Sequence, residues 1–285
     1  APGPRARQVS ACAPAVPGWA EWGFSVLSDW MGGHAAGDLA SRIIVSEMFA
    51  ELTLRSRDPA EVGGDLPLLL RHAVTVANDS LRAHVEARPA RKGLGGTVVA
   101  VTVGQDALHW ISVGDSTLLL WRDGKLKRLN AAHTMAAQME LMVKKGLMKA
   151  EAAANHPDRA CLTSAVMGED LDEIDCPDAG LNLRPGDVIL AASDGLETLR
   201  QGQIAQALSQ VADRGSRTVA RDLVAAVSRA DLPDQDNTSL IVIHTAPLTQ
   251  APAPAASAVP VLDRPGLMSR ALGWLRPAHA SKQTP

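Results

Sequence analysis

The sequence predicts an α+β fold in which antiparallel β-sheets are covered by helices. Two observations lead to this prediction: strands and helices come in separate blocks, and most successive strands are joined by short turns. Strands joined in this way pair in antiparallel fashion, whereas parallel strands need a long crossover that is usually helical. The chain has 285 residues, of which 46% are hydrophobic, enough to bury a sizeable core.

The first half of the chain carries one strand, two long helices and a run of three strands. An apolar strand over 24–28 leads into a Gly-rich segment, and 38–55 and 66–87 have apolar residues at the i, i+3 and i+4 spacing of helices. Strands are expected next at 97–103, 107–113 and 116–121. The dipeptide Asp123-Gly124 then gives a strong hairpin signal.

The second half repeats this block pattern. Helices are expected at 136–145 and 149–155, at 204–212 and at 217–229. The segments 188–193 and 240–244 are apolar and rich in β-branched residues, as buried strands are. No internal repeat interrupts this order, which favours one large domain.

Composition changes sharply near residue 247. We therefore expect one domain over residues 1–247, followed by a Pro/Ala-rich linker and a short amphipathic tail over residues 248–285. Apolar residues between 267 and 275 have roughly helical spacing, which predicts a short helix that docks on the domain or stays disordered. A helix that binds a membrane surface or a partner protein is the alternative.

Charge and cysteine content exclude several classes of protein. The net charge of −3 gives no general electrostatic reason to expect nucleic acid or an anionic membrane as a partner. No apolar run approaches the roughly 20 residues of a membrane span, and the N-terminus has no signal-peptide core. The three cysteines are scattered without a CxxC pair, which is typical of reduced thiols. We expect a cytoplasmic monomer without a transmembrane segment.

Four aspartates stand at the ends of predicted strands. Asp29 follows the strand at 24–28, and Asp115 lies in a tight turn between two strands. Asp194 follows the buried strand at 188–193, and Asp236 precedes the last strand. Carboxylates from strand ends can surround a hard cation such as Mg²⁺ or Mn²⁺, which prefers oxygen ligands. Each aspartate alone is also a common turn former, so both interpretations remain open at this point.

The motifs around these aspartates resemble those of the metal-dependent protein phosphatases of type 2C, in their bacterial form. They occur in the family's order over residues 3 to 245: DWMGGHAAG from Asp29, GGT from Gly95, GDS from Gly114, HT from His133, LTSAVMG from Leu162, GDVILAASDGL from Gly186 and DNT from Asp236. The first is similar to the family's Asp-Gly-Met-Gly-Gly-His-x-x-Gly, and the last to its Asp-Asn-x-Thr. The run that ends in Ser193-Asp194-Gly195 is the most specific of them.

The resemblance implies a four-layer α-β-β-α sandwich and a Ser/Thr protein phosphatase that uses Mn²⁺ or Mg²⁺. In the family, the aspartate that matches Asp29 bridges two ions, and those that match Asp194 and Asp236 complete one site. A backbone carbonyl at the position of Trp30 is a further ligand, and the arginine that matches Arg5 grips phosphate. Bacterial members often hold a third ion with the aspartates that match Asp115 and Asp194. The substrate would be a phosphoprotein made by a Ser/Thr kinase.

Some positions depart from the family pattern. Val9 and Ser10 stand where the family has Glu and Asp, and Trp30 replaces a glycine. Thr117 also stands where many members have Arg, and Ala132 where an Asp is usual. Losing two carboxylates beside a dication weakens its binding, so we expect the second metal site to be degraded. The alternative function is therefore a catalytically impaired pseudophosphatase that binds phosphoproteins or acts as a scaffold.

Overall fold

The computed structural model describes residues 9–13, 23–31, 34–55, 65–89, 93–104, 107–230, 232 and 235–245, with only the backbone described at 9–13, 31 and 34–37. By its contacts the chain divides after Pro247, and all described residues lie before that point. The predicted linker and tail over residues 248–285 lie outside the described residues, as does Arg5.

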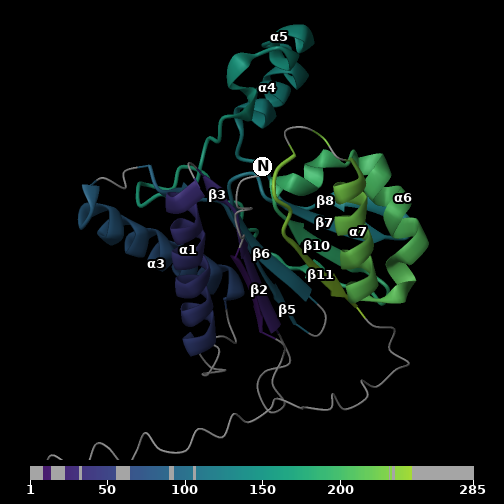
Figure 1. Ribbon diagram of the computed structural model, residues 1–285, viewed down its shortest axis with the longest axis horizontal. Coiled ribbons are helices and arrows are strands. Elements are labelled where there is room, and N and C mark those ends of the chain that lie inside the picture. The colour runs from purple at the N-terminus through teal and green to yellow at the C-terminus, as the bar shows by residue number, and fades with distance from the viewer. Residues whose placement is uncertain are drawn as a thin grey trace, which may run out of the picture. The chain divides into compact units, whose positions relative to one another are not determined.

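Two antiparallel sheets form the centre of this part of the chain (Figure 1). Among the described residues, one sheet has five strands in the order β1 (Val9–Ala13), β2 (Gly23–Ser28), β5 (Val98–Val103), β6 (Ala107–Val113) and β9 (Leu181–Asn182). The other has four, in the order β11 (Leu240–His244), β10 (Val188–Ala192), β7 (Thr117–Arg122) and β8 (Lys125–Arg128). A separate short pair joins β3 (Trp30–Met31) to β4 (Gly95–Gly96).

Helices cover the outer face of each sheet. α1 (His34–Arg55) and α3 (Leu66–Glu86) pack on the sheet that contains β2, and α6 (Gln201–Val211) and α7 (Ser216–Ala230) pack on the sheet that contains β10 (Figure 1). The predicted α+β class and the four-layer α-β-β-α sandwich are thus confirmed. No helix in the described ranges is both long and apolar enough to pass through a bilayer.

Three apolar clusters fill the spaces between the four layers. One lies between α1, α3 and the first sheet, one between α6, α7 and the second sheet, and one between the two sheets. In β5, Val98 and Ala100 belong to the first cluster, while Val99 and Val101 belong to the cluster between the sheets. Because both faces of β5 are buried, its sequence VVAVTV is apolar except for Thr102 and shows no alternation.

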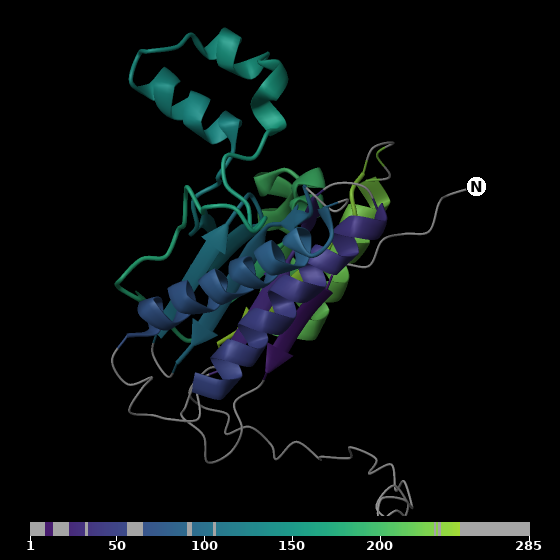
Figure 2. The same ribbon diagram turned by 90° about the vertical axis from the view of Figure 1, so that its left-hand side faces the viewer.

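A small helical segment projects from one end of the sandwich, as Figures 1 and 2 both show. It consists of α4 (Met135–Lys144), α5 (Ala150–Ala154) and the 3₁₀ turn η2 (Pro157–Ala160). α4 begins after Thr134, whose hydroxyl accepts a hydrogen bond from Ala137 N at 3.2 Å. This N-cap satisfies one of the free backbone donors of the first turn.

The observed elements differ from the predicted ones at weak sequence signals. α1 begins at His34, whereas the sequence predicts a helix only from residue 38, after the Gly-rich segment. A helical glycine such as Gly37 costs about 1 kcal/mol relative to alanine, which tertiary packing offsets here. β1, β3, β4 and β9 were not predicted. Three of these have two residues each, too few to show the alternation of a strand.

Candidate metal centre

Asp29 lies at the end of β2, where its backbone and side chain are both fixed. Its carbonyl oxygen accepts a hydrogen bond from Thr97 N at 2.8 Å, and its Oδ1 accepts one from Trp30 N at 2.8 Å. A Cβ on Gly96 would lie 2.6 Å from that carbonyl oxygen, so only glycine allows β4 to approach so closely. Asp29 is 8% exposed and is therefore a buried residue at the end of an inner strand of the sheet.

The turn that carries Asp115 is tied to the same place through Thr97. The hydroxyl groups of Thr97 and Ser116 lie 2.7 Å apart, and Ser28 Oγ donates to Thr97 O at 2.7 Å. Gly114 has a φ of +101°, and a Cβ there would lie 2.5 Å from Thr97 Cγ2. The glycine is therefore required both by its backbone conformation and by the lack of space.

Asp194 opens the 3₁₀ helix η3 (Asp194–Thr198), directly after β10. The next residue must be a glycine, because a Cβ on Gly195 would collide with the Asn237 carbonyl oxygen. Ser193 Oγ accepts from Ser239 N at 3.0 Å, which joins the end of β10 to the start of β11. Asp236 precedes β11 on that side, exposed, with Oδ1 accepting from Asn237 N at 2.7 Å.

Electrostatic interactions connect all four aspartates. Burial, together with the smaller effect of the negative charges of Asp29, Asp115 and Asp236, raises the pKa of Asp194 to about 8. Burial also raises the pKa of Asp115, with smaller upward contributions from Glu197 and Asp29. Asp194 therefore lies within electrostatic range of the three other strand-end aspartates that the sequence singled out.

The donor atoms fit a hard divalent cation. Asp194 Oδ1 and Thr238 Oγ1 are buried without a hydrogen-bond partner, and an unpaired buried oxygen is unfavourable unless it gains a ligand. In the described part of the chain, no three His, Cys, Asp or Glu side chains are gathered as closely as the ligands of a metal ion. Ionised carboxylates repel one another when no cation is between them, so their spacing here does not oppose a site at the buried, unpaired oxygen of Asp194.

The other predicted site residues differ in whether the structure places them near Asp29. Val9 and Ser10 lie in β1, where their backbones pair with Ser28 and Leu27 of the strand that ends at Asp29. The strand beside Asp29 thus carries no carboxylate at these positions. Trp30 lies in β3, paired with Gly96, and keeps its backbone beside the Asp29 side chain. Arg5 is not among the described residues, and its role stays a prediction.

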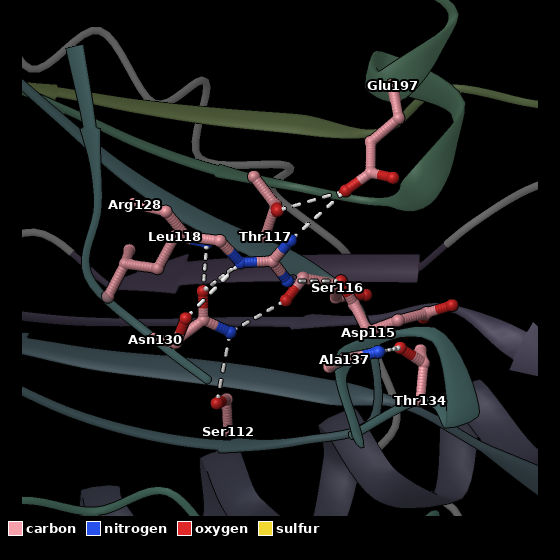
Figure 3. A network of polar contacts seen from close by, with 10 residues as sticks. All are labelled: Ser112, Asp115, Ser116, Thr117, Leu118, Arg128, Asn130, Thr134, Ala137 and Glu197. Atoms are coloured by element: carbon pink, nitrogen blue, oxygen red, sulfur yellow. Dashed lines mark hydrogen bonds and ion pairs between the residues drawn. The ribbon is translucent and has the colours of Figure 1, made fainter. Parts of the chain in front are cut away.

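Two of the polar residues that support the Asp115 turn, Arg128 and Asn130, were missed at the sequence level. Figure 3 shows Arg128 and Asn130 reaching from the end of β8 towards the Asp115–Ser116 backbone and Glu197. On the other side of the turn, Gly114 N donates to His133 Nδ1 at 3.1 Å. Burial lowers the pKa of His133, which favours the neutral ring that this acceptor role requires. His133 belongs to one of the motifs quoted from the sequence, whereas the only sequence signal for Arg128 and Asn130 was their position at the end of the predicted hairpin.

Similar proteins are known both as sequences and as solved structures, although no protein-family model matches the chain. The "Serine/threonine protein phosphatase PstP" of Mycobacterium tuberculosis is 31% identical over 221 residues, which cover 74% of this chain but only 40% of PstP. A "Putative protein phosphatase 2C-type" of Streptococcus pyogenes is 31% identical over 176 residues, covering 61% of this chain and 67% of that protein.

The structural similarity extends over most of the chain. The crystal structure of M. tuberculosis PstP superposes with a TM-score of 0.64 at 28% identity, covering 84% of this chain and 98% of that one. The PstP catalytic domain in complex with two manganese ions gives a TM-score of 0.60 at 29% identity, with 83% and 96% covered. Together with the sandwich and its strand-end aspartates, these relatives show that the chain belongs to the bacterial type 2C family of protein phosphatases.

Proposed function

We propose that the chain is a metal-dependent phosphatase that removes phosphate from phosphoserine and phosphothreonine in proteins. The observation that carries this proposal is the buried, unpartnered Asp194 Oδ1 beside three further carboxylates. A bare scaffold has no use for such a repulsive cluster, whereas a cation site requires it. The printed names of the relatives from M. tuberculosis and S. pyogenes support the same activity.

In this proposal, Asp29, Asp194 and Asp236 hold one ion, and Asp115 together with Asp194 contributes to an additional one. The carbonyl of Trp30 and the guanidinium of Arg5 take the roles of a further ligand and a phosphate-binding group. Bound Mn²⁺ or Mg²⁺ would supply activated water for in-line attack on phosphorus and neutralise the phosphoryl oxygens.

The chain's own contribution begins with the proton on Asp194. Because the pKa of this carboxyl is about 8, much of the metal-free protein holds a proton there at neutral pH. A bound cation would require the ionised form, so Asp194 would have to release this proton for the metal to bind. The hydrogen bonds from Trp30 N to Asp29 and from Asn237 N to Asp236 orient the other two carboxylates before the ion arrives.

The second ion of the pair would be held by fewer carboxylates than in the family pattern. Val9 and Ser10 occupy the strand next to Asp29, and neither supplies a negative charge. We expect this site to fill only at high Mn²⁺ concentration. The enzyme would then show a higher metal requirement than a relative that retains both carboxylates.

The substrate, location and oligomeric state follow from the same proposal. The substrate is a phosphoprotein made by a Ser/Thr kinase, and the enzyme acts as a cytoplasmic monomer. Residues 1–247 carry the activity, and residues 248–285 form the linker and tail. In support, no helix within the described ranges could span a membrane, and the net charge of −3 does not favour nucleic acid.

The test is hydrolysis of p-nitrophenyl phosphate and of a phosphothreonine peptide as the Mn²⁺ concentration is varied. Turnover that depends on Mn²⁺ and is abolished by Asp194→Ala is the expected result. If the chain binds Mn²⁺ in a calorimeter but shows no turnover at any concentration, the enzyme proposal is wrong. The chain would then be the metal-holding pseudophosphatase.

A further inference from the structure

Arg128 lies at the end of β8 with its guanidinium among groups from three segments of the chain. Its cross-strand partner is Leu119 of β7, so it shares a face with Leu119 and with Thr117, two residues earlier. Thr117 is 3% exposed and its side chain is short, which leaves room for the guanidinium to approach from the neighbouring strand. Figure 3 shows Arg128 in this position, between the Asp115 turn and Glu197.

The hydrogen bonds of Arg128 connect the two elements that carry Asp115 and Asp194. One terminal nitrogen donates to the Asp115 carbonyl oxygen at 2.9 Å, and the other donates to Glu197 Oε1 at 3.2 Å. Glu197 lies in η3, the 3₁₀ helix that Asp194 opens. Thr117 Oγ1 donates to the same Glu197 oxygen at 3.4 Å. The Arg128 guanidinium thus links the backbone of Asp115 to the 3₁₀ helix that begins at Asp194.

Asn130 fixes the other end of this arrangement. Its Oδ1 accepts from Leu118 N at 2.8 Å, and its Nδ2 donates to Ser116 O at 2.8 Å. Arg128 Nε donates to the Asn130 carbonyl oxygen at 3.2 Å, which orients the guanidinium plane. Asn130 is 5% exposed, so its bonds are protected from competition by water. Asn130 therefore orients the Arg128 guanidinium, which in turn reaches a Glu197 side chain that is 57% exposed.

We propose that Arg128 is a positioning residue that ties the Asp115 turn to η3 and so sets the separation between the Asp115 and Asp194 carboxylates. The inference deepens the proposed function, on which it rests, because these two carboxylates would share a metal ion. Arg128 contacts the backbone of Asp115, not its carboxylate, and so acts through geometry. Outer residues that orient metal ligands typically change metal affinity by about 10- to 100-fold when removed.

Charge alone predicts the opposite effect of removing Arg128. A positive side chain next to a cation site repels the cation, so its loss would strengthen metal binding if charge were the only influence. If Arg128 positions the two carboxylates, its loss weakens metal binding despite the removed repulsion. The direction of the change in affinity therefore separates the two explanations.

The experiment is calorimetric titration of the metal-free, full-length chain with Mn²⁺, for the wild type, Arg128→Ala and Arg128→Lys. We expect Arg128→Ala to weaken Mn²⁺ binding by about tenfold. The Mn²⁺ affinity of Arg128→Lys should lie between those of the wild type and Arg128→Ala, because lysine keeps the charge but cannot bind both partners with a planar guanidinium. Unchanged or tighter binding by Arg128→Ala would overturn the proposal.

Arg122→Ala is the matched control for a purely structural effect. Arg122 lies at the far end of β7 and binds Asp187 at 2.6 and 2.8 Å, away from the Asp115 turn. The Arg122→Ala substitution should lower the melting temperature at least as much as Arg128→Ala does, but it should leave the Mn²⁺ affinity unchanged. An equal loss of affinity in both variants would mean that Arg128 acts only through general stability, and the proposal would fail.

A double-mutant cycle tests whether Arg128 acts through Asp115. Asp115→Ala removes the carboxylate but keeps the carbonyl that Arg128 binds, so Arg128→Ala should have a smaller effect on affinity in this background. The same fold-loss in both backgrounds would contradict the proposal. If the wild type binds Mn²⁺ but hydrolyses no phosphate ester, only the proposed phosphatase activity is wrong. If the wild type binds no Mn²⁺, both the proposed activity and the proposed role of Arg128 are wrong.

Discussion

At the scale of single residues, glycines allow the aspartates to approach one another. Gly96, Gly114 and Gly195 each lie beside backbone or side-chain atoms that a Cβ would strike, and each adjoins a strand-end aspartate or its support. These glycines are thus part of the site although they carry no functional group. The glycines in the motifs around the aspartates are therefore explained by the lack of space for a side chain, and the aspartates by their chemistry.

Gly195→Ala is expected to destabilise the protein by about 1–3 kcal/mol, the usual cost of overpacking. The added methyl group would collide with the Asn237 carbonyl oxygen, and displacing that segment also moves Asp236. Urea denaturation of the metal-free chain measures the loss, and Mn²⁺ titration should show weaker binding. Gly202→Ala in α6 is the control: no atom lies within 4 Å of its new methyl group, so a gain of about 0.4–1 kcal/mol is expected. Similar effects of the two substitutions would contradict this explanation.

At the scale of elements, the second sheet is held at the end opposite Asp115 by a buried ion pair. Asp187 precedes β10, its side chain is 2% exposed, and it accepts two hydrogen bonds from Arg122 of β7 and one from Arg184 N at 2.7 Å. Burial alone would raise the pKa of Asp187, but these hydrogen bonds and the charge of Arg122 outweigh it and lower the pKa below 3.8. The pair therefore stabilises the fold at neutral pH.

Asp187→Asn is expected to cost about 2 kcal/mol at neutral pH, since it weakens hydrogen bonds to a charged group. A lowered folded-state pKa means that this stability is present above 3.8 and is lost as the pH falls through the lower folded value. The wild type and the variant should therefore converge in that acidic range, as measured by urea denaturation against pH. Asp222→Asn, whose partner Arg221 is 72% exposed, is the control and should change stability by less than about 0.5 kcal/mol. A constant difference at all pH values would refute the linkage.

β1 is the element in which this chain lacks two carboxylates of the family pattern, and Trp30 in β3 is a further departure. Val9→Glu with Ser10→Asp and Trp30→Gly should lower the Mn²⁺ concentration for half-maximal hydrolysis by about tenfold, because ligand charge returns next to Asp29. The same variant should be less stable without metal, since it adds charge to a repulsive cluster. Hydrolysis as a function of Mn²⁺ concentration measures the first effect, and thermal unfolding the second. No gain in hydrolysis would show that these positions do not limit the enzyme.

At the scale of the whole molecule, the long helices and strands were predictable from the sequence, whereas the hydrogen bonds that hold the aspartate-bearing turns were not. The helix predicted at 66–87 is observed as Leu66–Glu86, because its pattern repeats over many turns. The predicted grouping of the aspartates rested on their positions at strand ends together with the resemblance of their motifs to those of the type 2C family. The register that pairs Arg128 with Leu119 follows from the predicted two-residue turn at Asp123-Gly124. The role of Arg128 was not predictable, because its partners Asp115 and Glu197 come from other segments of the chain.

The metal-free molecule should become less stable as the pH rises. The pKa of Asp194 is about 8 in the folded protein and 3.8 in the unfolded chain, so the folded state binds the proton more tightly over that interval. A raised carboxyl pKa means that folding is favoured below the interval and that stability falls as pH increases through it. Bound Mn²⁺ would remove this penalty, because it pairs with the ionised carboxylates that otherwise repel one another.

Mn²⁺ should therefore stabilise the whole molecule more at the upper end of that pH range than at the lower end, where protons compete for the site. At a hundredfold excess over its dissociation constant, the ion adds about 2.7 kcal/mol to the free energy of unfolding. Scanning calorimetry with and without Mn²⁺ across this range measures both trends. Asp194→Asn removes the titrating group, so the metal-free variant should exceed the wild type in stability at high pH yet gain little from Mn²⁺. If it gains as much as the wild type, Asp194 is not a ligand, and the centre proposed here does not hold the ion.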